Sequence, residues 1–282
     1  MKYIDLHVHS NCSDGTLSPT QIVSLAIEKN LTAFALTDHD TVDGVEEAIS
    51  AAKASALKGH PLIVIPGVEL SASYKGEDIH ILGLCIDHHN PILLQALKEA
   101  ANERESRNYK MCSNLQKVGI PITVEKMKAD GKDAVLTRAH FAKYMLKEDY
   151  VSSMKEAFTK YLDSSSPYYV TREYLSPKQA IELILQAHGI PVLAHPLLYK
   201  LTPTQLKILI QDLKSYGLQG IEAIYSCNVN NDEAYVKSLA RKYNLLITGG
   251  SDFHGSVKPD IDLGSGRGNL CIPESILTDL KL

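Results

Sequence analysis

The sequence lacks any apolar run that approaches the roughly 20 residues needed to cross a bilayer, which excludes a membrane-spanning helix. Its start, MKYIDLHVHS, lacks the apolar stretch of a secretory signal. The five cysteines are odd in number, scattered along the chain and without a CxxC pair, which is typical of a reducing compartment rather than of a disulfide framework. These absences favour a cytoplasmic protein that makes no membrane contact.

The chain also lacks a basic excess, an internal repeat and a low-complexity tract. Its net charge of -4 gives no global signal for nucleic acid, so any nucleotide must be recognised locally. With 282 residues, 44% hydrophobic and 22% charged, it has the composition of an ordinary globular protein, long enough for one large domain or a domain with an insertion. We predict no stable protein partner from these features.

Short apolar runs alternate with amphipathic stretches along most of the chain. We expect strands at residues 3–8, 33–36, 62–68, 79–84, 191–194, 220–224 and 245–248. We expect helices at residues 19–29, 42–57, 177–187, 203–215 and 231–243, three of which begin with a hydroxyl residue before a proline, at Ser18, Ser176 and Thr202. This alternation predicts a parallel α/β barrel or open sheet, and seven strands suit a slightly incomplete barrel.

The alternation stops between about residue 90 and residue 170. A long helix is expected from residue 91 to about residue 120, and further helical segments at 123–129, 138–146 and 152–161, with no strand signals. The sequence therefore predicts a discontinuous barrel domain, residues 1–89 and 171–282, with a small helical insertion at residues 90–170.

The first predicted strand carries two histidines on one face. Side chains alternate along a strand, so Ile4 and Leu6 share one face, while His7 and His9 share the other. An H-x-H pair on a strand aims two imidazoles the same way, which is a common route to metal chelation, although the pair alone is a weak signal.

Other polar side chains follow the predicted strands where these end. His39 follows the second strand, Glu69 the third, His195 the strand IPVLA, and Asp252 with His254 the strand LLITGG. In parallel barrels the carboxyl ends of the strands carry the chemistry, which favours a shared site over separate turn or capping roles.

His80 begins its predicted strand, which is the wrong end for such a site. A hairpin formed by residues 69–74 and 78–84 would start the second arm near the site and remove the conflict. Nine side chains, six imidazoles and three carboxylates, would then converge on one rim: His7, His9, Asp14, His39, Glu69, His80, His195, Asp252 and His254. Nitrogen and oxygen donors without thiolate suit two or three ions of zinc, manganese or iron.

Six stretches, DLHVHSNCSDG, LTDHD, PGVELS, IHILG, LAHP and GSDFHG, resemble in this order the motifs of the PHP (polymerase and histidinol phosphatase) superfamily. The likeness extends over the whole chain and is greatest to bacterial phosphoesterases of this superfamily with a helical insertion. The resemblance implies a distorted seven-stranded barrel, a (β/α)7 variant, with a trinuclear metal centre. The family's ligand positions fall on the nine residues named above, and none departs from the pattern.

The resemblance also implies a reaction. Some relatives of this kind act on nucleoside 3′,5′-bisphosphates or as 5′→3′ exoribonucleases on short RNA. We expect three divalent ions, manganese first and zinc or iron as alternatives, with Glu69 bridging metals and a metal-bridging hydroxide that attacks phosphorus in line. Asp252 or a neighbouring histidine, such as His195, is expected to handle protons, and the sequence does not choose between them.

Two segments are candidates for substrate binding. Arg138 and His140, in LTRAHF, fall at the start of a predicted helix in the insertion, and related enzymes have a similar R-x-H-F stretch. An arginine fork suits a second phosphate, whereas the competing interpretation is a surface arginine. Arg267, in GSGRGN, lies between glycines that let a ligand approach the backbone.

Three other functions remain open at this stage. A histidinol-phosphate-type phosphatase keeps the chemistry and changes the substrate, and an amidohydrolase-like enzyme would cleave a C–N bond in a similar barrel. A non-catalytic, metal-stabilised module is the third, and the full set of ligand types argues against it. The insertion and the TRAHF stretch favour a small nucleotide or short 5′-phosphorylated RNA as the substrate.

Overall fold

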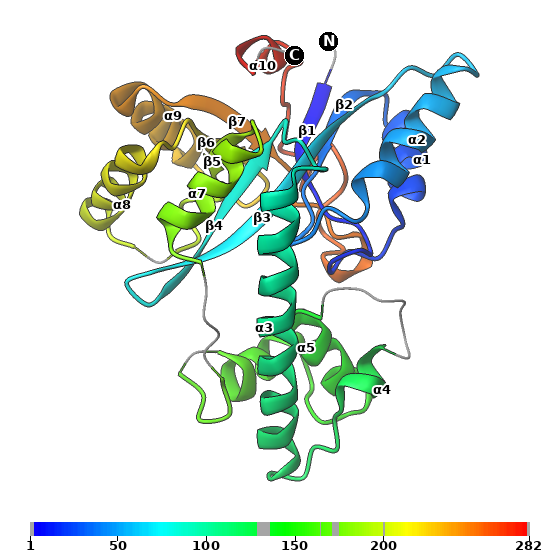
Figure 1. Cartoon of the computed structure of the whole chain (residues 1–282), viewed down its shortest axis with the longest axis vertical. Helices are drawn as coiled ribbons and strands as arrows, with labels where there is room; N and C mark the ends of the chain where they lie inside the picture. The colour runs from blue at the N-terminus through cyan, green and yellow to red at the C-terminus, as the bar shows by residue number, and fades with distance from the viewer. Residues whose placement is uncertain (1–2, 129–135, 164, 171–174, 200, 281–282) are drawn as a thin grey trace. The chain divides into compact units, whose positions relative to one another are not determined.

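A computed structural model describes residues 3–128, 136–163, 165–170, 175–199 and 201–280. The chain divides into two compact units, which we call the barrel unit (Met1–Ala96 with Leu175–Leu282) and the helical unit (Leu97–Tyr174), both drawn in Figure 1. The division falls within helix α3 (Pro91–Gln116). Residues 171–174, where the predicted barrel resumes, and residue 129, the predicted end of a short helix, lie outside the described residues.

One sheet of seven strands forms the centre of the barrel unit. The strands lie in sequence order: β1 (Tyr3–Val8), β2 (Leu31–Leu36), β3 (Ile63–Tyr74), β4 (Glu77–Leu84), β5 (Ile190–Leu193), β6 (Gly220–Tyr225) and β7 (Leu246–Gly250). The two edges approach each other, because Asp252 N donates to His7 O at 2.9 Å and His9 N donates to Phe253 O at 3.0 Å. The result is a nearly closed barrel, which confirms the predicted distorted seven-stranded fold.

The sheet is mixed rather than parallel. Strand β4 runs antiparallel to both of its neighbours, β3 and β5, while all other neighbouring pairs are parallel. Only Lys75 and Gly76 connect β3 to β4, with φ of 51° and 87°, and so short a connection permits a hairpin but no parallel crossover. The predicted hairpin is confirmed, and the expectation of an all-parallel barrel is wrong at this strand.

Helices pack outside the sheet, as Figure 1 shows. They are α1 (Pro19–Glu28), α2 (Val45–Ala56), α7 (Pro177–Gln186), α8 (Pro203–Tyr216), α9 (Asp232–Tyr243) and the short α10 (Ile276–Asp279). The hydroxyls of Ser18, Ser176 and Thr202 cap α1, α7 and α8 as predicted, each within a capping box. Helix α2 starts at Val45 rather than at residue 42, with Gly44 as its N-cap.

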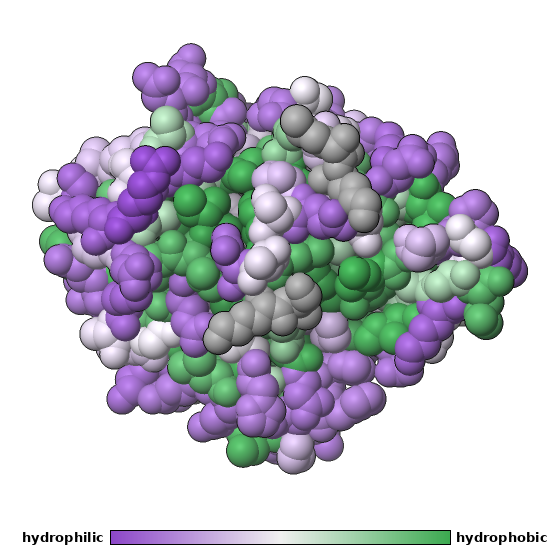
Figure 2. Space-filling view, turned by 90° about the horizontal axis from the view of Figure 1, so that it is seen from above, coloured by the Kyte–Doolittle hydropathy of each residue, from purple (hydrophilic) through white to green (hydrophobic). Residues whose placement is uncertain are grey.

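Apolar side chains from the strands fill the core of the barrel unit. The core cluster includes Ile4, Leu6, Ala33, Ala35, Ile65, Leu82, Leu84 and Val192, together with Ile272 and Ile276 near the C-terminus. Figure 2 looks onto the end at which both chain termini lie, where hydrophobic residues gather in the middle and hydrophilic residues surround them. The polar residues of interest instead follow the carboxyl ends of the strands.

The helical unit has a core of its own. The helical unit contains most of α3, together with α4 (Val124–Lys128), α5 (Arg138–Lys147), α6 (Met154–Ala157) and a π-helical turn (Phe158–Leu162). Its buried residues include Met111, Leu115, Ile122, Phe141 and Met145. The predicted helix at 152–161 is thus split in two. Across both units, no described helix combines the length and apolarity that a membrane crossing requires.

Candidate metal centre

Strand β1 places two imidazoles on one face. His7 and His9 are fully buried, and their ring centroids lie 5.1 Å apart. Ile4 and Leu6, on the opposite face, belong to the apolar core. The alternation expected from the sequence therefore holds, and both histidines join a cluster of polar side chains at the end of the strand.

Glu69 of β3 lies at the centre of that cluster. Its Oε2 is 3.2 Å from His7 Nε2, 3.2 Å from His9 Nε2 and 3.1 Å from His39 Nδ1. Its Oε1 is 2.9 Å from His80 Nδ1 and 3.0 Å from His195 Nε2. One buried carboxylate thus contacts five imidazoles that come from four segments of the chain, since His7 and His9 share β1.

Two further carboxylates complete the cluster. Asp14 Oδ1 lies 3.1 Å from His254 Nε2, and Asp14 Oδ2 lies 3.9 Å from His39 Nε2. Asp252 Oδ1 is 3.3 Å from His254 Nδ1, 3.5 Å from His9 Nε2 and 3.7 Å from His7 Nε2. The structure therefore brings together all nine side chains that the sequence singled out.

The hairpin explains how His80 reaches this cluster from the start of β4. In the antiparallel ladder His80 pairs with Ser71, two residues beyond Glu69 on the neighbouring strand. Residues two apart on a strand share a face, so His80 and Glu69 point to the same side of the sheet. The early part of β4 consequently lies beside the site.

Two of the nine residues have left-handed backbone conformations. The φ angle is 24° at His195 and 58° at Asp252. Positive φ is uncommon outside glycine and carries a strain that the surrounding structure must offset. Each residue stands two positions after the end of a strand, His195 after β5 and Asp252 after β7, and the side chains of both join the cluster.

The donor set fits divalent metal ions. Three overlapping groups have ligand atoms within 4.8 Å of one another: His9, Asp14, His39 and His254; His7, His9 and Glu69; and His39, Glu69 and His80. Within the described residues, several buried atoms of these side chains make no hydrogen bond, namely His7 Nε2, both nitrogens of His9, Asp14 Oδ1, His39 Nδ1, Glu69 Oε2 and His195 Nδ1. Buried polar atoms are rarely left unsatisfied, and bound cations would satisfy these.

The carboxyl groups of the cluster are ionised in this arrangement. Burial alone would raise their pKa values, but the surrounding imidazoles and the Lys258 ammonium lower the pKa of each well below its usual range. The main partners are His254 for Asp14, His39 for Glu69 and Lys258 for Asp252. Ionised carboxylates are the form that binds metal.

The imidazoles divide into two kinds. Burial lowers the pKa of His39 well below its usual value and also lowers the pKa of His254. Burial opposes protonation of His9 too, but the adjacent carboxylates of Asp252 and Glu69 raise its pKa to about 9. In the metal-free protein, protonated imidazoles such as His9 therefore supply part of the positive charge that bound cations would otherwise supply.

Several supporting residues were missed from the sequence. Glu222 of β6 contacts His7 Nδ1 at 3.0 Å and accepts the backbone N–H of His195 at 2.8 Å. Asp38 accepts from the N–H and the hydroxyl of Ser10 and from the hydroxyl of Ser13, at 2.5 to 2.8 Å. A carboxylate inside a strand as apolar as GIEAIY was a usable signal for Glu222.

A second pair of missed residues holds Asp252. Tyr225 Oη and Lys258 Nζ lie 2.7 Å and 2.6 Å from Asp252 Oδ2, the oxygen that faces away from the histidines. Burial and Asp252 raise the pKa of Tyr225, so this hydroxyl keeps its proton and donates. Burial would lower the pKa of Lys258, but the Asp252 carboxylate raises it, so the ammonium also donates.

The three predicted substrate-binding residues divide between the units. Arg138 is the first residue of α5, as expected, with its guanidinium 5.8 Å from the ring centroid of Tyr169. His140 Nδ1 accepts the N–H of Thr137 at 3.0 Å and so takes part in the capping box of that helix. Arg267, by contrast, belongs to the barrel unit and lies in a pocket that Asp252 also lines.

A nearly closed seven-stranded barrel with clustered histidines and carboxylates after its strands defines a metal-dependent hydrolase. The comparisons with known proteins agree, because the PHP domain profile matches residues 5–216. The chain belongs to the PHP domain family.

Three relatives illustrate the similarity. The chain is 37% identical over 253 residues to a 5′-3′ exoribonuclease of Haemophilus influenzae, covering 90% of each chain. It is 35% identical to a 3′,5′-nucleoside bisphosphate phosphatase of Chromobacterium violaceum, covering 94% of this chain and 91% of the relative. The crystal structure of a putative metal-dependent phosphoesterase of Bifidobacterium adolescentis superposes with a TM-score of 0.85 at 26% identity, covering 99% and 95%. The protein is thus a metal-dependent phosphoesterase.

Proposed function

We propose that this enzyme hydrolyses a phosphate ester of a small nucleotide, a nucleoside 3′,5′-bisphosphate, or acts at the 5′ end of short RNA. The observation that carries the proposal is the cluster of nine ligand-type side chains, in which the central Glu69 lies 2.9 to 3.2 Å from five imidazoles. The names of the relatives from H. influenzae and C. violaceum support this substrate class.

The nine residues would hold three divalent ions, with manganese as first choice and zinc or iron as alternatives. The three overlapping donor groups support this number. Ions bound there would neutralise charge on the phosphoryl oxygens and lower the pKa of a bound water. Nitrogen and oxygen donors dominate, and the nearby Cys12 thiol has a pKa raised by burial to about 11, so it is a poor ligand.

The protein's own groups would orient the reacting phosphate and move protons. Glu69 is suited to bridging ions, because its two oxygens face different sets of histidines. Asp252 has one oxygen toward the histidines and the other fixed by Tyr225 and Lys258, which holds its carboxylate in one orientation. His195 approaches Glu69 through Nε2, and its Nδ1 makes no hydrogen bond among the described residues, so His195 and Asp252 are the candidates for proton transfer.

Arg138 and His140 remain our candidates for binding a substrate phosphate from the helical unit. The insertion's contribution to the substrate pocket likewise remains a prediction. Its support is chemical, since Arg138 stands at a helix start where backbone N–H groups also favour an anion.

The decisive experiment compares substrates on the manganese-loaded enzyme. Adenosine 3′,5′-bisphosphate, a 5′-phosphorylated dinucleotide and histidinol phosphate are each supplied at several concentrations, and release of phosphate or nucleotide is followed. We expect kcat/KM to be highest for one of the two nucleotide substrates. Equal values for all three would contradict the substrate preference.

Two controls separate the remaining alternatives. Ammonia release from a panel of amides, without phosphate release from any ester, would indicate a C–N hydrolase. A fully manganese-loaded protein that hydrolyses no phosphoester would indicate a non-catalytic module. Metal content measured by mass spectrometry before each assay ensures that an inactive sample is not simply a metal-free one.

A further inference from the structure

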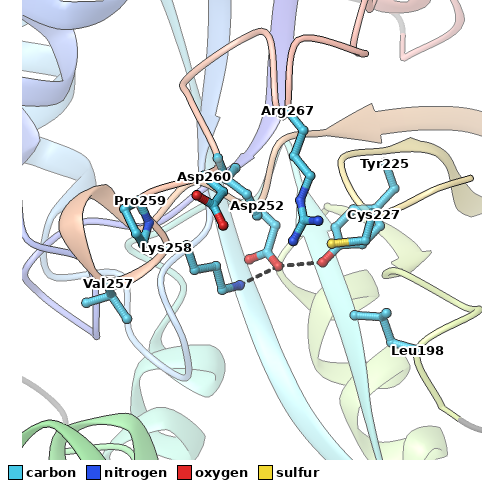
Figure 3. Close-up of a pocket in the computed structure, with 10 residues that line it drawn as sticks. Leu198, Tyr225, Cys227, Asp252, Val257, Lys258, Pro259, Asp260 and Arg267 are labelled. Carbon is cyan, nitrogen blue, oxygen red and sulfur yellow. Dashed lines mark hydrogen bonds and ion pairs between the residues drawn. The ribbon is translucent and has the colours of Figure 1, made fainter. Parts of the chain in front are cut away.

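A pocket of about 360 Å³ opens beside the metal centre within the barrel unit (Figure 3). Pockets of this size are typical of small-molecule sites. Its lining combines polar and apolar side chains: Leu198, Tyr225, Cys227, Asp252, Val257, Lys258, Pro259, Asp260, Ile261 and Arg267. Most of these residues have no role in the metal binding or proton transfer proposed above.

Asp252 is a wall shared by the pocket and the metal centre. Its Oδ1 faces His9 and His254, while its Oδ2 accepts from Tyr225 and Lys258, which line the pocket. Figure 3 shows both contacts as dashed lines converging on the Asp252 carboxylate. The Asp252 carboxylate thus has one oxygen at the metal centre and the other at the pocket, so the two sites adjoin each other.

Arg267 is the cation available in the pocket. Figure 3 shows its guanidinium pointing inward toward Asp252, yet it forms no ion pair within 4.0 Å among the described residues. The charge of Lys258 is already matched by Asp252, whereas Arg267 and the second carboxylate of the lining, Asp260, are both exposed to solvent. A guanidinium fork binds two oxygens of a phosphate at once, and a positively charged group with no partner favours an anionic ligand.

We propose that this pocket binds the second phosphate of the substrate through Arg267. The inference rests on the proposed function and names the group that selects the substrate. A nucleoside bisphosphate carries two phosphates on one ribose, and 5′-phosphorylated RNA carries a phosphodiester next to its terminal phosphate. Both substrates thus place a second phosphate near the first, and the apolar side chains Leu198 and Ile261 offer a surface to the attached sugar.

Lys258 and Tyr225 have a different part in the pocket. Both donate to Asp252 at 2.6 to 2.7 Å, so they position that carboxylate for the metal centre. Loss of either is expected to affect every substrate, whatever its number of phosphates. Loss of Arg267 should affect only substrates that carry a second phosphate, and this contrast makes the proposal testable.

The test compares Arg267→Ala with the parent enzyme and with Arg241→Ala, a matched loss of an exposed arginine on α9. Adenosine 3′,5′-bisphosphate, a 5′-phosphorylated dinucleotide and p-nitrophenyl phosphate, which has a single phosphate, serve as substrates. We expect Arg267→Ala to lower kcat/KM for the nucleotide substrates about 10- to 100-fold, the loss typical of a charged hydrogen bond, and to leave p-nitrophenyl phosphate close to the parent value. Arg267→Lys should restore part of the loss.

The two nucleotide substrates distinguish the source of the second phosphate. A loss for adenosine 3′,5′-bisphosphate alone assigns the pocket to a phosphomonoester, and a loss for the dinucleotide alone assigns it to the RNA backbone. An equal loss for all three substrates, or no loss for either nucleotide, overturns the proposal.

A binding measurement keeps the pocket testable even if the proposed function fails. Adenosine 5′-monophosphate, which retains one phosphate, is titrated calorimetrically into the manganese-loaded parent, Arg267→Ala and Arg241→Ala proteins. We expect a Kd about 10-fold or more higher for Arg267→Ala only, at unchanged manganese content. If the parent protein hydrolyses no phosphoester, the proposed function is wrong and this titration alone decides the pocket. An unchanged Kd overturns the inference.

Discussion

Glu222 links two of the metal-centre histidines from a neighbouring strand. Its Oε1 lies 3.0 Å from His7 Nδ1, and its Oε2 accepts the backbone N–H of His195 at 2.8 Å. The Glu222 carboxylate and the His7 ring are both buried, so water does not compete for these contacts. A proton held on His7 Nδ1 by this contact leaves Nε2, the nitrogen that faces Glu69, free to bind metal.

We expect Glu222→Gln to weaken manganese binding by roughly 10- to 100-fold, as substitution of such supporting carboxylates usually does. The amide keeps the size of the side chain but loses the charge that fixes the His7 tautomer. Competition with a chelator of known affinity measures the change, and circular dichroism checks that the variant is folded. Glu233→Gln, which removes an exposed carboxylate paired with Lys237 on α9, is the control and should bind manganese normally. Equal affinities for the two variants would contradict the orienting role.

The importance of Glu222 depends on tertiary structure, which the sequence does not display. The alternation along DLHVH and the polar residues after each apolar run were enough to predict the nine clustered side chains, since local periodicity sets which face a residue occupies. The contact between Glu222 and His7 requires β6 to lie near β1, which follows only when β7 closes the barrel onto β1. Lys258 likewise reaches Asp252 through a loop whose path no pattern predicts.

The fold was predictable to a similar extent. Capping residues such as Ser18 marked helix starts, because a hydroxyl before proline satisfies the first free N–H groups. The direction of each strand was harder to predict from the sequence. The reversal at β4 depends on a two-residue turn at Lys75 and Gly76, which the sequence shows only as a Lys-Gly-Glu stretch. For Arg138 the sequence supplied a helix start, which the structure confirms, whereas its contact with the Tyr169 ring depends on how the helical unit folds.

Manganese binding should release protons and strengthen as pH rises. The pKa of His9 in the metal-free protein is about 9, so this ring is protonated at neutral pH. A metal ion binds only the neutral imidazole, hence each ion that takes His9 must displace its proton. The apparent affinity should rise with pH by about tenfold per unit for each proton displaced, and level off as His9 loses its proton near pH 9.

Calorimetric titration of manganese in two buffers of different ionisation enthalpy measures the protons released. The variant His60→Gln, which alters an exposed histidine in a loop, should release as many protons as the parent protein. An affinity that stays constant between pH 7 and pH 9 would be inconsistent with a protonated His9.

Arg138 is the alternative to Arg267 as the residue that binds the second phosphate. In that case Arg138→Ala should reduce hydrolysis of adenosine 3′,5′-bisphosphate by roughly 10-fold or more, and that of p-nitrophenyl phosphate, which has no second phosphate, much less. Steady-state kinetics on both substrates measures the two losses. Lys143→Ala, an exposed cation on the same helix α5, is the control for a general loss of positive charge. Equal losses on both substrates would remove Arg138 from the recognition role.

Gly250, the last residue of β7, permits the close approach of that strand to β1. A Cβ added there would lie 2.1 Å from His7 Cβ and 2.7 Å from His7 N, so either the strand or His7 would have to move. We expect Gly250→Ala to lower the free energy of unfolding by about 1–3 kcal/mol or more, the usual cost of overpacking, and to reduce manganese content because His7 is displaced. Urea denaturation and metal analysis give the two quantities. Gly59→Asn is the control, since no atom lies within 4 Å of its added Cβ and asparagine tolerates the local φ of 90°. A Gly250→Ala protein as stable and as metal-rich as Gly59→Asn would mean that β7 can shift without moving His7.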